Sequence, residues 1–391
     1  MNNFTFFSPT KFVFGKGVEN KTGDLCKQFG ANKVLIVYGG GSVVRSGLLA
    51  RVEESLKTAN IEYVEFGGIQ PNPIDTKVYE GIELVRKENI DFILPVGGGS
   101  AIDTAKAIAV GVPYEGDFWD FYLGKAKVKA ALPVATVLTI PAAGSEGSGD
   151  SVITKVDGMN KLGLGSELMR PKFSIMNPEL TMTLPANQTA YGIVDMMAHI
   201  FERYFTNTKN VEVTDRVAEG LLIAIMNEAK KVVANPQDYE ARANIMWSGT
   251  IAHNGLCGVG RAEDWMTHCM EHEVSGLNDK IAHGAGLAVI FPAWMTFMAK
   301  NHPYKVAQMA ERIFNVEHVG SDEEIALKGI AKLREFFAIL NMPKSLSELG
   351  FVKSDIDTLV RKFHQNNGEK IEGVYYTMTP EVTRAIYEIA L

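Results

Sequence analysis

The hydrophobic positions in the first half of the chain follow two alternating patterns. Segments of strand length that are rich in apolar residues cover residues 12–14, 33–38, 61–66, 92–96 and 134–140, and the segment 33–38 is a continuous apolar run. Between them, the sequence predicts an amphipathic helix over residues 48–59, a helix over residues 78–88 and the start of a helix over residues 104–110. Strands that alternate with helices are typical of a mostly parallel sheet with helices packed on its faces.

The pattern changes after Leu184-Pro185, where apolar positions take a helical period and strand-like runs disappear. Helical patterns cover residues 189–204, 214–234, 239–253, 306–314, 322–339 and 354–363. A chain of 391 residues is too long for one hydrophobic core. We therefore expect two domains: an α/β, Rossmann-like domain over residues 1–184 and an all-helical domain over residues 185–391.

Three of the predicted strands run directly into glycine-rich loops. These loops are Gly39-Gly40-Gly41-Ser42, Gly97-Gly98-Gly99-Ser100 and Pro141-Ala142-Ala143-Gly144-Ser145-Glu146. The carboxyl ends of parallel strands meet at one edge of a sheet, where ligands bind. Glycine lets backbone N–H groups approach a phosphate closely, and a following helix N-terminus favours the anion.

A tight strand-to-helix turn also selects glycine, so one such loop alone is weak support for a phosphate site. The GxGxxG spacing of the standard Rossmann fingerprint is absent. The three loops together predict a dinucleotide that binds in another manner. Asp103 could orient its ribose or cap the helix that follows Gly99.

The second half carries candidate metal chemistry. Asp195 and His199 are four residues apart, which places them on one face of a helix, among Ile193, Met197 and Phe201. An ionised carboxylate in an apolar wall is costly unless it has a partner. The pair is either a hydrogen bond within the helix or half of a metal site beside the expected domain boundary, where clefts usually form.

The other half of a metal site has candidates in His268 and His283. Asp195, His199, His268 and His283 would supply one carboxylate and three imidazoles, a set that suits Zn²⁺ or Fe²⁺ rather than Ca²⁺ or Mg²⁺. His272, four residues after His268, would then be free to move protons. His253 ends a predicted helix, where a capping role is the simpler interpretation.

Composition narrows the class of protein. The chain has 46% hydrophobic and 22% charged residues and a formal charge of −7, which argues against nucleic-acid and anionic-membrane partners. No apolar run reaches the roughly 18 residues that cross a bilayer, and the N-terminus lacks the pattern of a signal peptide. Three cysteines without a CxxC pair suit a reducing cytoplasm.

These motifs together resemble the iron-containing, or group III, alcohol dehydrogenase family. The resemblance rests on Gly97–Asp103, Gly144-Ser145-Glu146, Asp195-x-x-x-His199 and the pair His268 and His283, and it extends over essentially the whole chain. The segment from Asn254-Gly255 to Glu271-His272-Glu273 is similar to the NADPH-dependent butanol dehydrogenases. Two features depart from the family pattern: Ala143 replaces a common hydroxyl residue, and the gap from His268 to His283 is about one residue longer.

The resemblance implies a dinucleotide-binding domain followed by a helical metal domain. It implies that Asp195, His199, His268 and His283 bind one Fe²⁺ or Zn²⁺ and that His272 lies near the substrate. It also implies the following contacts with NADP(H): Gly39, Gly40, Ser42, Asn72, Gly98, Gly99, Ser100, Asp103, Thr139, Ser145 and Lys161.

The expected reaction is the interconversion of primary alcohols such as butanol with their aldehydes. The metal would act as a Lewis acid on the substrate oxygen, the nicotinamide would carry hydride, and His272 or a ribose hydroxyl would carry the proton. Lack of an acidic residue in Gly39–Ser42 favours NADP(H) over NAD(H). We expect a cytoplasmic homodimer.

Other functions remain compatible with these residues. A glycerol dehydrogenase or another polyol oxidoreductase could use the same fold. A dehydroquinate-synthase-like lyase would need a cluster of basic residues, but residues 264–291 contain only Lys280. A metal-dependent hydrolase would not bind a dinucleotide, and a non-enzymatic binding protein would not need the complete set of metal ligands.

Overall fold

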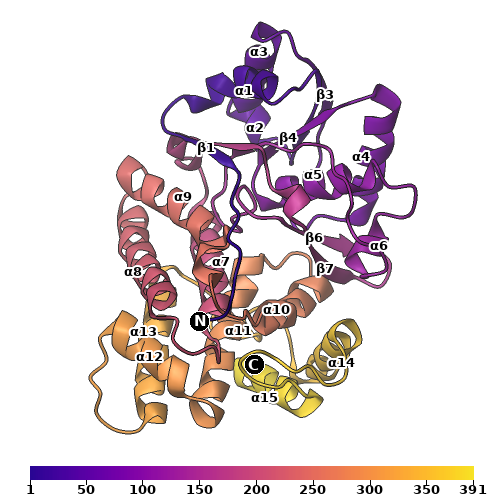
Figure 1. The fold of residues 1–391 in the computed structure, drawn as a ribbon. Helices are drawn as coiled ribbons and strands as arrows, with labels where there is room; N and C mark the ends of the chain where they lie inside the picture. Colours follow the sequence, from indigo (N-terminus) through magenta and orange to yellow (C-terminus); the bar gives the residue numbers. More distant parts are fainter. The chain divides into compact units, whose positions relative to one another are not determined.

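The computed structural model describes residues 1–391 and divides them into two compact units (Figure 1). One unit comprises Phe7–Leu184 and contains every strand. The other comprises Met1–Phe6 and Pro185–Leu391 and contains only helices and loops. The predicted fold class, an α/β region followed by an all-helical region, is confirmed.

The α/β unit is built around a six-stranded sheet in which all neighbouring strands are parallel. The strand order is β1-β8-β5-β4-β2-β3. The strands are β1 (Lys11–Phe14), β2 (Lys33–Tyr38), β3 (Glu62–Phe66), β4 (Phe92–Gly97), β5 (Thr136–Leu138) and β8 (Phe173–Met176). The helices of this unit are α1 (Thr22–Gln28), α2 (Ser42–Arg45), α3 (Leu48–Thr58), α4 (Asp75–Glu88), α5 (Gly99–Gly111) and α6 (Trp119–Tyr122).

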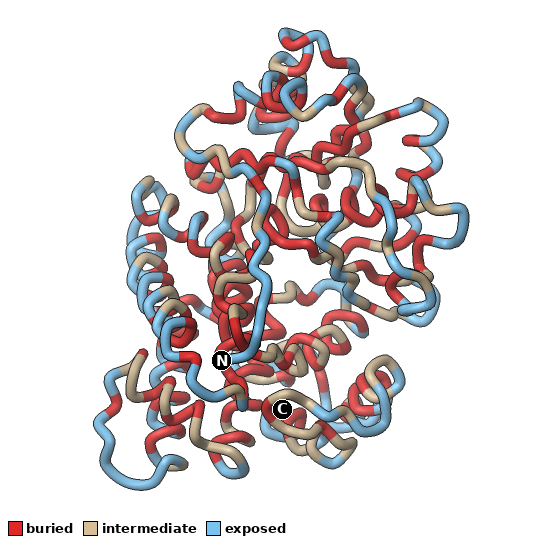
Figure 2. The backbone as a smooth tube through the Cα atoms, in the orientation of Figure 1, coloured by how far each residue is buried: buried red, intermediate tan, exposed pale blue.

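Apolar side chains cover both faces of the sheet, which explains why its central strands β2 and β4 are nearly continuous apolar runs, whereas the edge strand β3 carries Glu62 and Glu65. On β2, Leu35 and Val37 join one hydrophobic cluster with residues of α4, α5 and α6. Val34 and Ile36 point the other way and join a second cluster with residues of α1 and α3. Most residues of the central strands are therefore buried (Figure 2).

The three glycine-rich loops lie at one edge of this sheet. They follow β2, β4 and β5, and β4 pairs with both of the other two strands. The amide of Thr139, just after β5, donates to the carbonyl of Gly97 at the end of β4 over 3.0 Å. The topology therefore brings the loops together as the sequence predicts.

Three strands were not predicted from the sequence. β8 fills the place between β1 and β5 in the sheet. β6 (Asp150–Lys155) and β7 (Asn160–Gly165) form a separate antiparallel hairpin. The amide of Thr154 in β6 donates to the carbonyl of Pro73, so the hairpin is tied to the loop before α4.

The helical unit contains nine α-helices, among which a single large hydrophobic cluster forms the core. They are α7 (Ala186–Tyr204), α8 (Glu212–Ala234), α9 (Tyr239–His253), α10 (Met266–Leu277), α11 (His283–Asn301), α12 (Tyr304–Phe314), α13 (Asp322–Ile339), α14 (Ile356–Asn367) and α15 (Pro380–Ala390). None of the helices is long and apolar enough to span a membrane.

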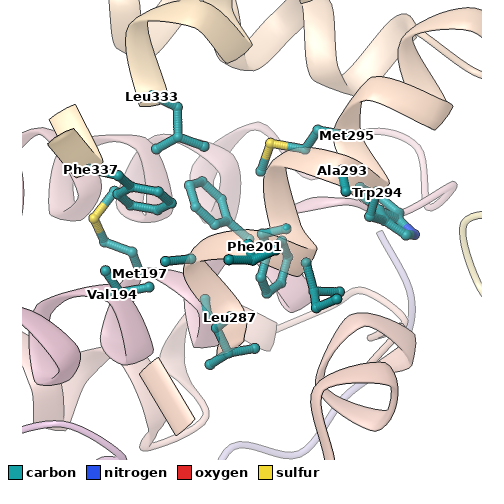
Figure 3. Close-up of a cluster of buried hydrophobic side chains, with 14 of the residues drawn as sticks. Val194, Met197, Phe201, Leu287, Ala293, Trp294, Met295, Leu333 and Phe337 are labelled. Atoms are coloured by element: carbon teal, nitrogen blue, oxygen red, sulfur yellow. The ribbon is translucent and has the colours of Figure 1, made fainter. Parts of the chain in front are cut away.

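One side of helix α7 packs against this hydrophobic core and holds the helix in place. Val194, Met197 and Phe201 point into a cluster with Leu287 of α11 and Leu333 of α13 (Figure 3). Burial of a side chain of this size contributes about 1.5–3 kcal/mol. Met197 and Phe201 do not surround Asp195 and His199, as the sequence analysis expected, because these two residues lie on the other side of α7 at about 3.6 residues per turn. The packing of α7 against the core therefore fixes the predicted metal ligands.

Candidate active site

Asp195 and His199 lie one turn apart on α7, and both are buried. The Nδ1 atom of His199 is 3.7 Å from the Oδ1 atom of Asp195. The distance is longer than a hydrogen bond, so the two groups do not simply pair with each other. Nδ1 of His199 is buried and has no hydrogen-bond partner.

Helices α10 and α11 bring His268 and His283 to the same place. His283 is the first residue of α11, and its Nε2 atom is 3.7 Å from Oδ1 of Asp195. The ring centroid of His268 is 4.8 Å from that of His199 and 5.3 Å from that of His283. Asp195, His199 and His268 each offer a ligand atom within 4.8 Å of the others. All four predicted ligands therefore converge.

Two buried glutamates contact the imidazoles of this cluster. Oε1 of Glu202, on α7, is 2.7 Å from Nδ1 of His268 and also accepts a hydrogen bond from the His268 backbone amide over 2.7 Å. A carboxylate oxygen of Glu271, on α10, is hydrogen-bonded to Nδ1 of His283. A carboxylate on Nδ1 fixes the tautomer in which Nε2 carries the lone pair.

An aromatic and cationic layer surrounds His199. The ring of His253 lies 4.2 Å from the ring of His199, and its Nδ1 atom is 3.2 Å from an Nη2 nitrogen of Arg203. The guanidinium of Arg203 lies over the ring of Trp265, 4.7 Å from its centroid. Trp265 has a φ of 66°, a left-handed conformation that is uncommon for a bulky residue and is often found at functional sites.

Burial controls the ionisation of these groups. It lowers the pKa of His199 well below its ordinary value, assisted by the neighbouring His253, so the ring is neutral and has a lone pair to donate. Burial raises the pKa of Glu202 to about 8, and burial followed by repulsion from Glu202 raises the pKa of Asp264 to about 7. The pKa of Glu202 stays raised although the Arg203 guanidinium nearby lowers it, and a bound divalent cation would add the positive charge that keeps these carboxyl groups ionised. The donor set fits Fe²⁺ or Zn²⁺.

His272 lies beside this group of four. It is half-buried on α10, and its ring centroid is 5.4 Å from that of His283. The side chain of His283 itself keeps 24% of its surface exposed, whereas that of His268 keeps 5%. The side of the cluster next to His283 and His272 is therefore its most accessible side.

The residues expected to contact the cofactor all belong to the α/β unit. Gly39 and Gly40 follow β2, and Ser42 begins α2. Gly98 is the N-cap of α5, Gly99 and Ser100 are its first residues, and Thr139 follows β5. Ala143, at the position that departs from the family pattern, lies close to Gly99, because a Cβ added at residue 99 would lie 3.3 Å from the Cβ of Ala143.

A buried network holds the third glycine loop against α5. The Asp103 carboxylate accepts hydrogen bonds from Oγ of Ser145 (2.7 Å) and from the amide of Val152 (3.0 Å). Lys106 is fully buried and donates to Oγ and the carbonyl of Ser145 and to the carbonyls of Ser148 and Asp150. Asp103 does not cap α5; it orients Ser145.

Asn72 and Lys161 also lie together. Nζ of Lys161, on β7, donates to Oδ1 of Asn72 over 3.1 Å, and the side chain of Lys161 is buried. Asn72 has a φ of 51°, a left-handed conformation that asparagine tolerates. The hairpin that the sequence did not predict thus brings one expected cofactor contact to another.

Comparison with known proteins identifies the family. The sequence profile described as "Iron-containing alcohol dehydrogenase" matches residues 9–178, and the one described as "Fe-containing alcohol dehydrogenase family, C-terminal" matches residues 189–391. The chain is 45% identical over 367 residues to the probable NADH-dependent butanol dehydrogenase 1 of Bacillus subtilis, with 94% of each chain covered. It is 37% identical over 394 residues to the NADPH-dependent aldehyde reductase of Escherichia coli, with 100% of each covered.

A solved structure shows the same fold. The crystal structure of NADH-dependent butanol dehydrogenase A from Thermotoga maritima matches with a TM-score of 0.96 at 42% identity, covering 100% of this chain and 99% of that one. The chain belongs to the iron-containing alcohol dehydrogenase family. An iron-containing alcohol dehydrogenase is an oxidoreductase that uses a nicotinamide cofactor and iron or another divalent metal, and its relatives act on alcohols and aldehydes.

Several residues at the site of this iron-containing alcohol dehydrogenase were not predicted from the sequence. Glu202 had a usable signal, because Asp195, His199 and Glu202 stand at i, i+4 and i+7 on one helix face. Glu271 had none, since its partner His283 belongs to another helix. His253 was interpreted as a helix cap; it does end α9, but its buried ring lies against His199.

Proposed function

We propose that this dehydrogenase is metal-dependent, prefers NADP(H), and interconverts primary alcohols such as butanol with their aldehydes. The observation that carries the proposal is the convergence of one carboxylate and three imidazoles from α7, α10 and α11 on one buried point. The names of the relatives support the substrate class, because they include butanol dehydrogenases and an aldehyde reductase.

In this proposal Asp195, His199, His268 and His283 hold one Fe²⁺ or Zn²⁺. Such an ion, when bound, supplies Lewis-acid polarisation of the substrate oxygen. His272, beside the accessible side of the cluster, exchanges the proton of the alcohol. The neutral state of His199 keeps that ring available as a ligand and leaves proton transfer to His272.

The α/β unit holds the cofactor in the same proposal. The backbone at the first turn of α5 receives a phosphate, since the free N–H groups of a helix N-terminus favour an anion. Ser145 and Lys161 supply polar side chains whose positions are set by hydrogen bonds to Asp103 and Asn72. None of these residues belongs to the metal cluster, so the cofactor binds without the ion.

The preference for NADP(H) rests on the loop after β2. Gly39, Gly40, Gly41 and Ser42 place no carboxylate there to bind the ribose and repel a 2′-phosphate, and Arg45 on α2 adds a positive charge. The names of the relatives point both ways, since several are called NADH-dependent and one NADPH-dependent.

Steady-state kinetics with both cofactors tests this preference. We expect kcat/KM to favour NADPH by at least about tenfold, equivalent to about 1.4 kcal/mol, and Gly39→Asp to erase or reverse the ratio. A Cβ at residue 39 would lie 3.2 Å from the carbonyl oxygen of Ile69, so a side chain there also crowds the backbone. Gly39→Asn is the matched control, because it adds the same crowding without the charge. Equal kcat/KM values in the unmodified enzyme refute the preference.

Two further expectations belong to the proposal. A substrate series of butanol, glycerol and 1,3-propanediol distinguishes a dehydrogenase of simple primary alcohols from a polyol dehydrogenase. The polyol alternative is tested because one relative, 30% identical, is named 1,3-propanediol dehydrogenase. We also propose that the enzyme works as a cytoplasmic homodimer. The free state of all three cysteines suits that compartment, and the exposed Phe4, Phe6 and Phe7 offer apolar surface to a second copy.

A further inference from the structure

Two of the three imidazoles in the metal cluster have a buried carboxylate at Nδ1. Nε2 of His283 lies 3.7 Å from Oδ1 of Asp195, while Nδ1 of the same ring is hydrogen-bonded to Glu271. Nδ1 of His268 is 2.7 Å from Oε1 of Glu202. Glu202 and Glu271 are 2% and 0% exposed, so water does not compete for these contacts.

We propose that Glu202 and Glu271 are positioning residues that set the affinity of the metal site. The inference rests on the proposed function, because it assumes that the histidines bind a divalent ion. A carboxylate that accepts Nδ1–H leaves the Nε2 lone pair toward the ion, fixes the plane of the ring and makes the nitrogen a stronger donor. Loss of such a partner typically weakens metal binding about 10–100-fold.

Glu202 is built into the same helix face as two of the ligands. Asp195, His199 and Glu202 are spaced i, i+4 and i+7 on α7, whose other side is fixed in the hydrophobic core. Glu202 also accepts the backbone amide of His268, near the start of α10. One rigid helix therefore supplies two ligands directly and orients the third from behind.

Glu271 reaches His283 through a gap that only glycine leaves open. A Cβ at Gly286, in the first turn of α11, would lie 2.5 Å from Oε1 and 2.7 Å from Cγ of Glu271. The carboxylate thus lies against the N-terminal turn of α11, where the helix dipole favours a negative charge. A purely space-filling residue at position 271 would not need this charge.

Glu273 provides a matched control on the same helix. It is also buried, at 3% exposure, but its Oε1 atom accepts a hydrogen bond from the side-chain amide of Asn366 over 2.7 Å. Exchange of Glu273 for Gln removes a buried carboxylate from α10 at a position hydrogen-bonded to Asn366. Any general effect of losing a buried carboxylate on α10 appears in this variant.

The test measures Co²⁺ affinity directly on the full chain. Chelator-treated protein and the variants Glu202→Gln, Glu271→Gln and Glu273→Gln compete for Co²⁺ with a chromophoric chelator, while circular dichroism checks the fold. We expect the dissociation constant to rise about 10–100-fold for the first two variants, with a changed visible Co²⁺ spectrum, and to stay unchanged for Glu273→Gln.

Several outcomes would overturn the inference. Unchanged affinity and an unchanged spectrum in both Glu202→Gln and Glu271→Gln leave these residues as packing, and an equal loss in all three variants assigns the effect to burial alone. Where Glu271→Gln does not fold, Gly286→Ala displaces the same carboxylate and gives the same comparison. If the unmodified protein binds no Co²⁺, the proposed function fails instead, which separates the two failures.

Discussion

The buried Lys106 predicts a link between the stability of the α/β unit and cofactor affinity. Its Nζ atom makes four hydrogen bonds of 2.7 to 2.9 Å, all to residues 145–150. Ser145 accepts two of them, and its hydroxyl donates a hydrogen bond to the Asp103 carboxylate. Lys106→Met keeps the length of the side chain and removes all four, so the loop that carries Ser145 loses its attachment to α5.

The expected cost follows from the burial of the groups left behind. Hydrogen bonds to a charged group contribute about 1.5–3 kcal/mol each, and removal of one partner from a buried charged network costs about 3–5 kcal/mol in total. We expect the free energy of unfolding to fall by that amount. Because Ser145 is an expected cofactor contact, the dissociation constant for NADPH should rise at least about tenfold, or about 1.4 kcal/mol.

Lys305 supplies the control, because it is another fully buried lysine but belongs to the helical unit. Its Nζ atom is 2.5 Å from Oδ2 of Asp215. Lys305→Met should destabilise the protein to a similar degree in urea and leave NADPH affinity unchanged. Fluorescence titration with NADPH compares the two variants. An unchanged dissociation constant in Lys106→Met, or an equal loss in Lys305→Met, would refute the role of this network in cofactor binding.

Two more predictions concern the role of His272 in proton transfer and the ionisation of Lys106. His272→Ala should retain stoichiometric metal and lower kcat roughly 10²-fold if this residue carries the proton; an unchanged kcat would leave His272 as packing. Burial lowers the pKa of Lys106 from its ordinary value of 10.5 to about 8. Between pH 8 and pH 10.5 the unfolded chain therefore binds more protons than the folded protein. The stability contributed through Lys106 rises with pH over this range. Urea unfolding at several pH values should therefore show the unmodified protein gaining stability relative to Lys106→Met across that range, and a flat difference would contradict the assignment.

The fold was predictable where local pattern and tertiary environment agree. β2 and β4 are continuous apolar runs because helices cover both faces of the sheet, and the sequence shows both strands directly. β8 is only four residues long, and its place between β1 and β5 depends on pairing with distant residues. α11 was missed because it is buried on nearly all sides and contains Pro292, so it has no polar stripe to reveal its period.

The site was predictable as far as spacing within one helix could show it. Asp195 and His199 share a helix face, and the histidines that complete the set are rare enough in the chain to be singled out. The contact of Glu271 with His283 joins α10 to the first residue of α11 and has no local signal. The role of Asp103 likewise depends on the β6–β7 hairpin, in which the alternation of apolar and polar residues is weak.

A metal titration of chelator-treated protein, followed by the NADPH-driven reduction of butyraldehyde, tests most directly whether the activity depends on the proposed metal site. We expect activity to rise from zero to a plateau at one Fe²⁺ or Zn²⁺ per chain. We expect Asp195→Ala to bind NADPH but to gain neither metal nor activity. Full turnover in the metal-free protein, or stoichiometric metal and full turnover in Asp195→Ala, would contradict it.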